Sequence, residues 1–332
     1  DSTWQAYNGW GGANLYGGNG PGGDSAPGRA YAVSYNRPIT TREGGGTYAG
    51  PQDFIFGAEF SALSWLEMNG YDVSYISGVD TARDGAGLLD HKVFLSVGHD
   101  EYWSGQQRAN VEAARDAGVN LAFLSGNTMY WRTRWEASID GSDTDYRTLV
   151  SYKETRAGAK IDPSTEWTGT WRDLSYDPAL GGQTPENALQ GTMFQVDSYR
   201  LDTITIPYEM TQLRFWRNTE VAETAPGETA ALVQNLLGYE WDIAPDTSFT
   251  PDGLIKLSSS TYDVNTLLAD YGTAVGPGTA THNLTLYRAE SGALVFGAGT
   301  VYWSWGLDSN HDLEATPTDI NVQQAMVNLF AD

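Results

Sequence analysis

The segment from residue 92 to residue 104 constrains the fold and function of this chain more than any other. Residues 93–97 form an apolar run rich in β-branched side chains, Gly98 interrupts it, and His, Asp, Glu and Tyr then follow in succession at positions 99–102. Strands buried on both faces of a parallel sheet read as continuous apolar runs. Open α/β sheets place their chemistry at the carboxyl ends of such strands. We therefore predict a buried parallel strand that delivers its last side chains to a functional site.

The composition narrows the class of protein. The chain has 332 residues, of which 40% are hydrophobic and 12% aromatic, enough for a packed core of one large domain or two moderate ones. Lys plus Arg number 19 against 42 Asp plus Glu, a net charge of −23, which argues against nucleic acids and anionic membranes as partners. The absence of cysteine excludes disulfides, zinc-thiolate sites, iron–sulfur clusters and a cysteine nucleophile.

The order of expected elements predicts the fold class. Strand patterns at residues 31–35, 71–76, 93–97 and 119–124 alternate with helical patterns at 54–69 and at 104–118, the latter with Ser104 as its N-cap. Strands that alternate with helices predict a doubly wound, flavodoxin-like parallel sheet with right-handed crossovers. We expect residues 1–145 to form the first part of this α/β core.

The remainder of the chain has a different pattern of expected secondary structure. Short β runs separated by turn residues predict a β-rich insertion over residues 146–282, including strands near 167–172 and 213–216. Residues 283–332 then return to a hairpin around Glu290–Gly292, an extended stretch over 297–305 and a helix over 319–330. We expect this last part to supply the final strands and helix of the core.

Several sequence blocks together resemble a known family. They are Trp-Gln-Ala-Tyr-Asn-Gly-Trp-Gly-Gly at residues 4–12, Leu-Glu-Met-Asn-Gly-Tyr-Asp-Val at 66–73, Leu-Ser-Val-Gly-His-Asp-Glu-Tyr-Trp at 95–103, Phe-Leu-Ser-Gly-Asn-Thr-Met-Tyr-Trp-Arg at 123–132 and Gly-Tyr-Glu-Trp-Asp at 238–242. This set is similar to the C-terminal part of the large subunit of N,N-dimethylformamidase, over nearly the whole chain. Residues 168–172 and 303–308 look closest to an exported bacterial branch of that family. The resemblance implies a core like that of glutamine amidotransferases without the cysteine, and a secreted or cell-surface location.

The resemblance also implies a site and a reaction. Enzymes of this family hold one iron(III) ion through two tyrosines and a glutamate, which here match Tyr7, Tyr35 and Glu101. A histidine, an asparagine and a second glutamate surround the substrate and match His99, Asn127 and Glu240. The implied activity is hydrolysis of the C–N bond of a linear, non-peptide amide such as a formamide. The expected partners are thus a small amide and, in a homo-oligomer, further copies of the chain.

The chemistry of these side chains is self-consistent. Two phenolates and a carboxylate are hard oxygen ligands with three negative charges, a set that suits trivalent iron better than zinc or copper. His99 could give a proton to the departing amine, Glu240 could act as a base toward water, and Asn127 could hold the amide oxygen. Because side chains alternate along an extended segment, we expect His99 and Glu101 to face one cleft and Asp100 to face away.

Two other functions stay open at this point. The chain could be an exported glycan-binding or cell-surface module, with some of its 12 tryptophans and the glycine-rich residues 9–28 as a sugar platform. It could also be a glycosidase that uses Glu101 and Glu240 as its carboxylate pair. The chain opens at Asp1 without a leader pattern, so we expect a mature or excised form, and it contains no apolar run of membrane-spanning length.

Overall fold

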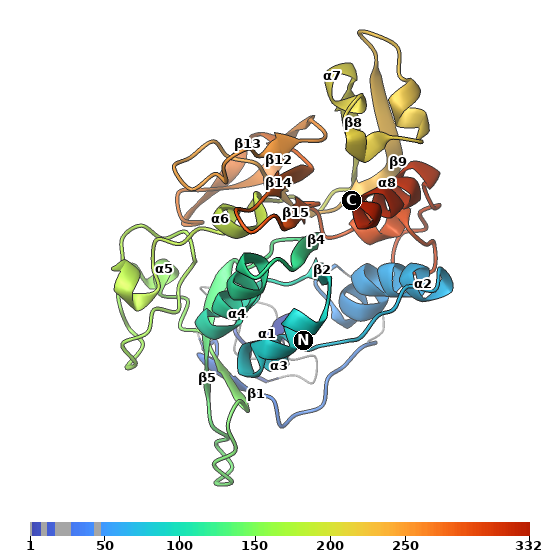
Figure 1. The fold of residues 1–332 in the computed structure, drawn as a ribbon. Helices are drawn as coiled ribbons and strands as arrows, with labels where there is room; N and C mark the ends of the chain where they lie inside the picture. The colour runs from blue at the N-terminus through green and yellow to red at the C-terminus, as the bar shows by residue number, and fades with distance from the viewer. Residues whose placement is uncertain (1, 8–11, 17–27, 43–47) are drawn as a thin grey trace.

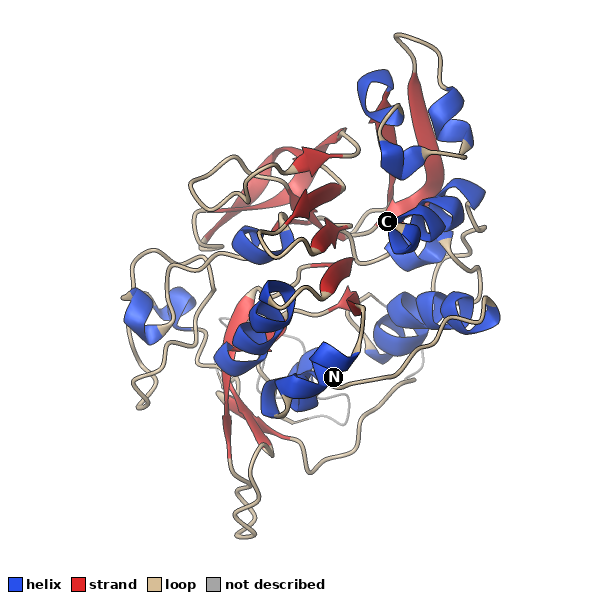
Figure 2. Ribbon diagram, in the orientation of Figure 1, coloured by secondary structure: helices blue, strands red, loops and turns tan. Residues whose placement is uncertain are grey.

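The computed structural model describes residues 2–7, 12–16, 28–42 and 48–332. Its α-helices are α1 (Ser2–Tyr7), α2 (Phe60–Met68), α3 (Gly78–Arg83), α4 (Gly105–Asp116), α5 (Glu154–Ala157), α6 (Asn187–Gln190), α7 (Tyr208–Thr211) and α8 (Ile320–Ala331). The strands are β1 (Ala32–Ser34), β2 (Val93–His99), β3 (Tyr102–Ser104), β4 (Asn120–Gly126), β5 (Trp131–Glu136), β6 (Thr148–Val150), β7 (Met193–Asp197), β8 (Asp202–Pro207), β9 (Thr229–Leu237), β10 (Glu240–Ile243), β11 (Ile255–Lys256), β12 (Ser260–Ala269), β13 (Ala274–His282), β14 (Thr285–Arg288) and β15 (Leu294–Gly297) (Figures 1 and 2). Short 3-10 segments are η1 (Pro51–Asp53), η3 (Gly85–Asp90), η4 (Pro178–Leu180), η5 (Arg214–Trp216), η6 (Glu220–Glu223) and η7 (Trp303–Gly306), and η2 (Phe54–Glu59) is a π-helix.

A five-stranded sheet in the order β11-β14-β15-β4-β2 organises the described core. Strand β4 lies in parallel between β2 and β15, so segments from the two ends of the chain share this sheet. Helix α4 packs Val111 and Ala114 against Leu121 and Phe123 on one face, and α2 packs against the other face of β4. Apolar side chains on both faces of β4 explain its continuous hydrophobic run.

The prediction of a flavodoxin-like, doubly wound parallel sheet of the glutamine amidotransferase type is wrong. In the described part of the five-stranded sheet only β2, β4 and β15 run parallel, whereas β14 and β11 join this sheet antiparallel. The other sheets are the β1-β6-β5-β3 sheet, in which only the β3–β5 pair is parallel, a closed antiparallel barrel of β10, β13, β12 and β7, and the antiparallel β8–β9 pair. Alternation of apolar residues shows which face of a strand is buried, but it does not encode the partner or direction of pairing. The fold is therefore a mixed, β-rich α/β structure.

Several local predictions can be compared with the structure. The Ser104 side chain accepts the Gln107 backbone N–H at the start of α4, which confirms the predicted N-cap. The β14–β15 hairpin is also confirmed. The strands predicted at 71–76, 167–172 and 213–216 are wrong, because the first two segments have no assigned strand and the third contains the 3-10 segment η5. The boundaries at residues 145 and 282 stay predictions.

Glycines bring the ends of the parallel strands close to neighbouring backbone. His99 pairs with Gly126 at the carboxyl ends of β2 and β4. Gly98 has φ +72°, and a Cβ there would lie 2.9 Å from the Cβ of Ala58. A Cβ on Gly126 would lie 2.9 Å from the backbone of Thr300. Glycine is therefore required at this edge, where the strands deliver their last side chains.

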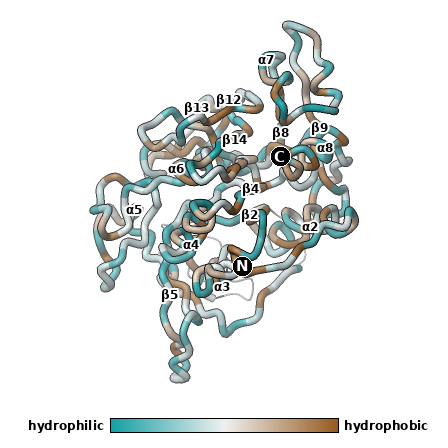
Figure 3. Tube along the Cα trace, viewed as in Figure 1, coloured by the Kyte–Doolittle hydropathy of each residue, from teal (hydrophilic) through white to brown (hydrophobic). Residues whose placement is uncertain are grey.

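The hydropathy of the helices is mixed along their length. Figure 3 shows hydrophobic and hydrophilic residues interleaved along α2 and α8. Within the described ranges, no helix is long and apolar enough to span a membrane.

Candidate active site

Three of the predicted residues meet at the carboxyl ends of the parallel strands. His99 is the last residue of β2, Asn127 follows β4 directly, and Glu240 opens β10. Asn127 Nδ2 donates to Glu240 Oε1 at 3.2 Å, and His99 Nε2 lies 3.5 Å from Glu240 Oε2. All three residues are buried, with exposed fractions of 6% for His99, 3% for Asn127 and 7% for Glu240. The structure therefore brings the three predicted catalytic residues together.

Strand β10 holds Asn127 through two carboxylates. Asn127 has φ +49°, a conformation that asparagine adopts more readily than most residues. Its backbone N–H donates to Asp242 Oδ1 at 2.9 Å, while its side chain binds Glu240. Asp242 Oδ2 in turn accepts the Thr192 hydroxyl at 2.8 Å. Two carboxylates from alternate positions of one strand thus fix both the backbone and the side chain of Asn127.

A second cluster contains Tyr7, Tyr16 and Glu101. The Tyr16 hydroxyl donates to Glu101 Oε1 at 2.6 Å, and the Tyr102 hydroxyl donates to the Tyr16 oxygen. The rings of Tyr7 and Tyr16 stack with centroids 4.4 Å apart. Burial raises the pKa of Tyr7 well above its ordinary value, and the charges of Glu101 and Glu240 raise it further. The Phe54 ring lies 5.5 Å from the Tyr7 ring and 5.5 Å from the His99 ring, between centroids, so the two clusters form one site.

Tyr35, predicted as the second tyrosine, lies elsewhere in the described structure. It follows β1, its hydroxyl donates to Ser2 Oγ at 3.0 Å, and its ring meets the Trp135 ring edge-on. Burial raises its pKa, and the neighbouring carboxylate that adds to this effect is Asp100. The structure therefore places Tyr16, and not Tyr35, against Glu101.

The position of Tyr16 follows from local hydrogen bonds. Leu15 donates its backbone N–H to the Ala6 carbonyl at 3.0 Å, and Asn14 Nδ2 donates to the Tyr7 carbonyl at 2.7 Å. These bonds fold residues 12–16 back on the end of α1. The sequence offered one signal for this residue, a second tyrosine nine positions after Tyr7.

A buried network that the sequence did not reveal surrounds His99. Its Nε2 lies 3.0 Å from the Tyr239 hydroxyl, which donates to Asp53 Oδ2 at 2.9 Å. The Tyr302 hydroxyl donates to Asp53 Oδ1 at 2.5 Å, and Asp53 is fully buried. Among the described residues, His99 Nδ1 has no hydrogen-bond partner. Burial lowers the pKa of His99, and the charge of Asp53 opposes this shift.

The site is strongly acidic. Asp197 lies directly opposite Glu240 in the β7–β10 register. The pKa of Glu240 is raised well above its ordinary value by burial, and further by the charges of Asp197, Glu101 and Asp53. Burial likewise raises the pKa of Asp197 to about 6. Two carboxylates that face each other in a buried environment favour either a shared proton or a bound cation.

One buried cation lies behind the tyrosines. Lys153 is fully buried in a left-handed backbone conformation. Its Nζ lies 3.5 Å from the centroid of the Tyr16 ring and 4.5 Å from that of Trp131. No motif in the sequence indicated a role for this residue.

Metal binding here would have to use tyrosine. In the described part of the chain, no group of three or more His, Cys, Asp or Glu side chains is arranged to hold a metal ion. The converging oxygens that could do so are those of Tyr7, Tyr16 and Glu101. This donor set retains the two phenols and one carboxylate predicted from the sequence, with one tyrosine exchanged.

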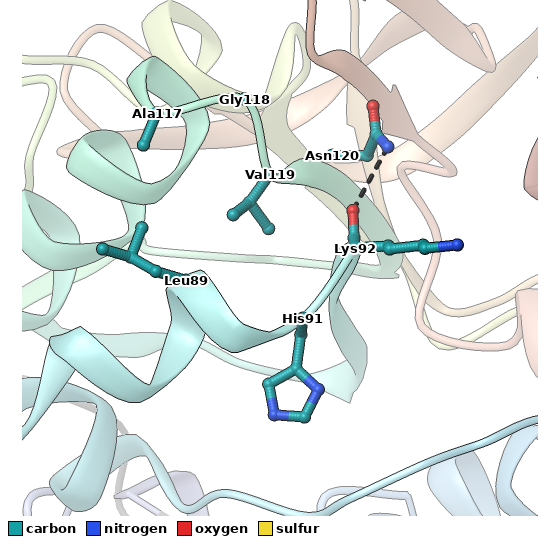
Figure 4. Close-up of a pocket in the computed structure, with 7 residues that line it drawn as sticks. All are labelled: Leu89, His91, Lys92, Ala117, Gly118, Val119 and Asn120. Atoms are coloured by element: carbon teal, nitrogen blue, oxygen red, sulfur yellow. Dashed lines mark hydrogen bonds between the residues drawn. The ribbon is translucent and has the colours of Figure 1, made fainter.

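A shallow depression of about 390 Å³ lies at the opposite ends of the same strands. It is lined by Leu89, His91, Lys92, Ala117, Gly118, Val119 and Asn120 (Figure 4). The His91 ring and the Lys92 amine point in different directions, and Asn120 Nδ2 donates to the Lys92 carbonyl at 3.2 Å. Since these residues precede or begin β2 and β4, the depression is separate from the cluster around His99.

The tryptophans bear on the glycan-binding alternative. Every tryptophan in the described ranges is buried or half-buried. Exposed indole faces are what a sugar platform needs, so the described surface offers none. The glycine-rich residues 9–28 lie largely outside the described residues.

Comparison with known proteins supplies the remaining observation. The sequence model of a family described as N,N-dimethylformamidase beta subunit-like, C-terminal, matches residues 1–315. A search of curated proteins finds no matching sequence. The matched range includes every residue of the site described above.

Proposed function

Because this chain belongs to the N,N-dimethylformamidase beta subunit-like family, we propose that it is an iron-dependent hydrolase that cleaves the C–N bond of a linear, non-peptide amide. An amide hydrolase is consistent with the family as a whole. The proposal of iron and of a linear amide substrate rests on one observation, which is that two clusters of side chains meet at one buried site. Tyr7 and Tyr16 lie against Glu101, and His99 lies beside the Glu240–Asn127 pair.

We assign the proposed iron ligands as Tyr7, Tyr16 and Glu101. Hard, anionic oxygen donors suit trivalent iron, and the excess of buried carboxylate over cationic groups in the site favours a cation. The hydrogen bond between Tyr16 and Glu101 supports Tyr16 in place of Tyr35, whose hydroxyl is occupied by Ser2. When bound, the metal would supply Lewis acidity.

Residues of this chain would bind the substrate and transfer the protons. Asn127 Nδ2 carries two hydrogens; one binds Glu240, and the other can donate to the amide oxygen of a substrate. Burial raises the pKa of Glu240, so its carboxylate is a stronger base toward water than that of an exposed glutamate. Burial favours the neutral imidazole of His99, which can accept a proton released by the attacking water and then return it to the departing amine. Asp53 and Tyr239 fix the orientation of the imidazole.

Elemental analysis and a hydrolysis assay test this proposal together. The purified protein should contain about one iron per chain and release amine from formamide or acetamide. A protein that stays iron-free after reconstitution and releases no amine would refute it. Export, a homo-oligomer and a second subunit are further proposals, supported by the family and by the likeness of residues 168–172 and 303–308 to its exported branch.

A further inference from the structure

An exposed tyrosine lies at the edge of the acidic site. Tyr199 belongs to the turn between β7 and β8, and 61% of its surface is exposed. Its φ is +48°, which is rare for an aromatic residue. Asn127 and Lys153 share this backbone conformation, and such conformations gather at functional sites.

The Tyr199 ring continues the network around His99 toward the surface. It stacks on the Tyr239 ring with centroids 5.3 Å apart and an interplanar angle of 19°. The Tyr239 hydroxyl lies 3.0 Å from His99 Nε2. An exposed aromatic face is thus separated from the proposed proton carrier by a single ring.

Tyr199 lies close to the acidic groups of the site, two residues after Asp197 and stacked on the neighbour of Glu240. Its pKa is raised to about 12, first by burial and then by the charges of Asp197, Glu240, Asp53 and Glu101. The charge of Tyr199 also raises the pKa of Tyr7. Tyr199 is therefore coupled to the charges of the site although 61% of its surface is exposed.

We propose that Tyr199 forms the wall of the site that contacts the substituent on the amide nitrogen, and so determines which N-substituted amides are accepted. This inference rests on the proposed function, because it uses His99 as the group beside the departing amine. The nitrogen end of the substrate then lies next to the Tyr239–Tyr199 stack. An alkyl group on that nitrogen packs on the Tyr199 ring, and the alkylammonium product is attracted to the same aromatic face.

The substrate class follows from this arrangement. Small, uncharged amides with an apolar N-alkyl group fit an aromatic wall beside four carboxylates. Anionic substrates are repelled by Glu101, Glu240, Asp53 and Asp197. The acyl side of the amide points away from Tyr199.

The test compares N-butylformamide with pentanamide, which carries its alkyl chain on the acyl side, and with formamide. Tyr199→Ala should lower kcat/KM for N-butylformamide at least about tenfold more than for the other two, mainly through KM, the usual worth of a few apolar contacts. Tyr199→Phe keeps the ring and should keep the wild-type ratios within about threefold. Tyr75→Ala removes a tyrosine of similar exposure, 63%, that hydrogen-bonds Glu67, and serves as the matched control. Equal losses for N-butylformamide and pentanamide would overturn the inference.

A binding measurement separates this inference from the proposed function. Ligand-observed NMR with N-butylformamide should show binding to the wild-type protein and at least about tenfold weaker binding to Tyr199→Ala. If no amide is hydrolysed but this difference is seen, the proposed function fails and the role of Tyr199 stands. Equal binding, or no binding to the wild type, overturns the inference.

Discussion

The hydroxyl of Tyr16 donates a 2.6 Å hydrogen bond to Glu101 Oε1, across 85 positions of the sequence. This bond joins the short segment after α1 to the link between β2 and β3. It places two stacked phenols, Tyr7 and Tyr16, beside a carboxylate. The first prediction depends on which tyrosines make this set.

We expect Tyr7→Phe and Tyr16→Phe each to weaken the phenolate-to-iron colour and to reduce the iron content, because each removes one of the two phenolate ligands and almost no volume. Tyr35→Phe should keep both, since its hydroxyl binds Ser2. Visible absorption and elemental analysis of the three variants give the answer. Loss of colour in Tyr35→Phe with retention in Tyr16→Phe would reverse the assignment.

His99→Ala should retain iron but lose amide hydrolysis by roughly 10² to 10⁴ fold, the usual worth of general acid-base catalysis. Asp100→Asn is the matched control. The Asp100 carboxylate accepts the Ser96 hydroxyl at 2.8 Å, away from the His99–Tyr239 contact, so turnover should change little. Iron content and turnover are measured for both variants. Wild-type activity in an iron-loaded His99→Ala protein would remove His99 from the mechanism.

Glu59 gives a prediction about stability and pH. Burial raises its pKa to about 7 from the ordinary value of 4.5 for a glutamate. When the pKa of a carboxyl is higher in the folded than in the unfolded state, its contribution to the free energy of unfolding is fully present below about pH 4.5. That contribution is lost as the pH rises through about 7. Glu59→Gln should therefore match the wild type at pH 4.5 and be more stable by about 2–3 kcal/mol at pH 8. Urea denaturation of both proteins at pH 4.5 and pH 8 measures the difference in their free energies of unfolding. The same difference at both pH values would contradict the prediction.

The fully buried pair of Arg172 and Glu186 gives a prediction about the core. Arg172 Nη2 donates to Glu186 Oε1 at 2.6 Å, and Nε contacts both carboxylate oxygens. Removing one partner leaves an uncompensated buried charge, so Arg172→Met or Glu186→Met alone should cost about 3–5 kcal/mol. The double variant should cost less than either single one. Denaturant midpoints of the three variants test this; additive losses would show that the two charges are not coupled.

The sequence by itself determined the local features of this protein. Val93–His99 and Asn120–Gly126 read as buried strands because apolar side chains cover both faces, and Ser104 marks the start of α4 because its side chain caps the helix. The blocks around His99, Asn127 and Glu240 also pointed to the family and to residues that meet in the structure. These features depend on neighbours within a few residues, which a linear pattern records.

Only the tertiary structure decided how these pieces combine. Strand β15 joins β4 in parallel while its hairpin partner β14 runs antiparallel, so the sheet is not the doubly wound one that the alternation of elements predicted. The choice of Tyr16 over Tyr35 beside Glu101 depends on how residues 12–16 fold back on α1. Asp53 accepts the Tyr239 hydroxyl across 186 positions from the 3-10 segment η1, whose sequence carries no motif. Such contacts depend on strand pairing and chain closure over long separations, and no periodicity along the sequence encodes them.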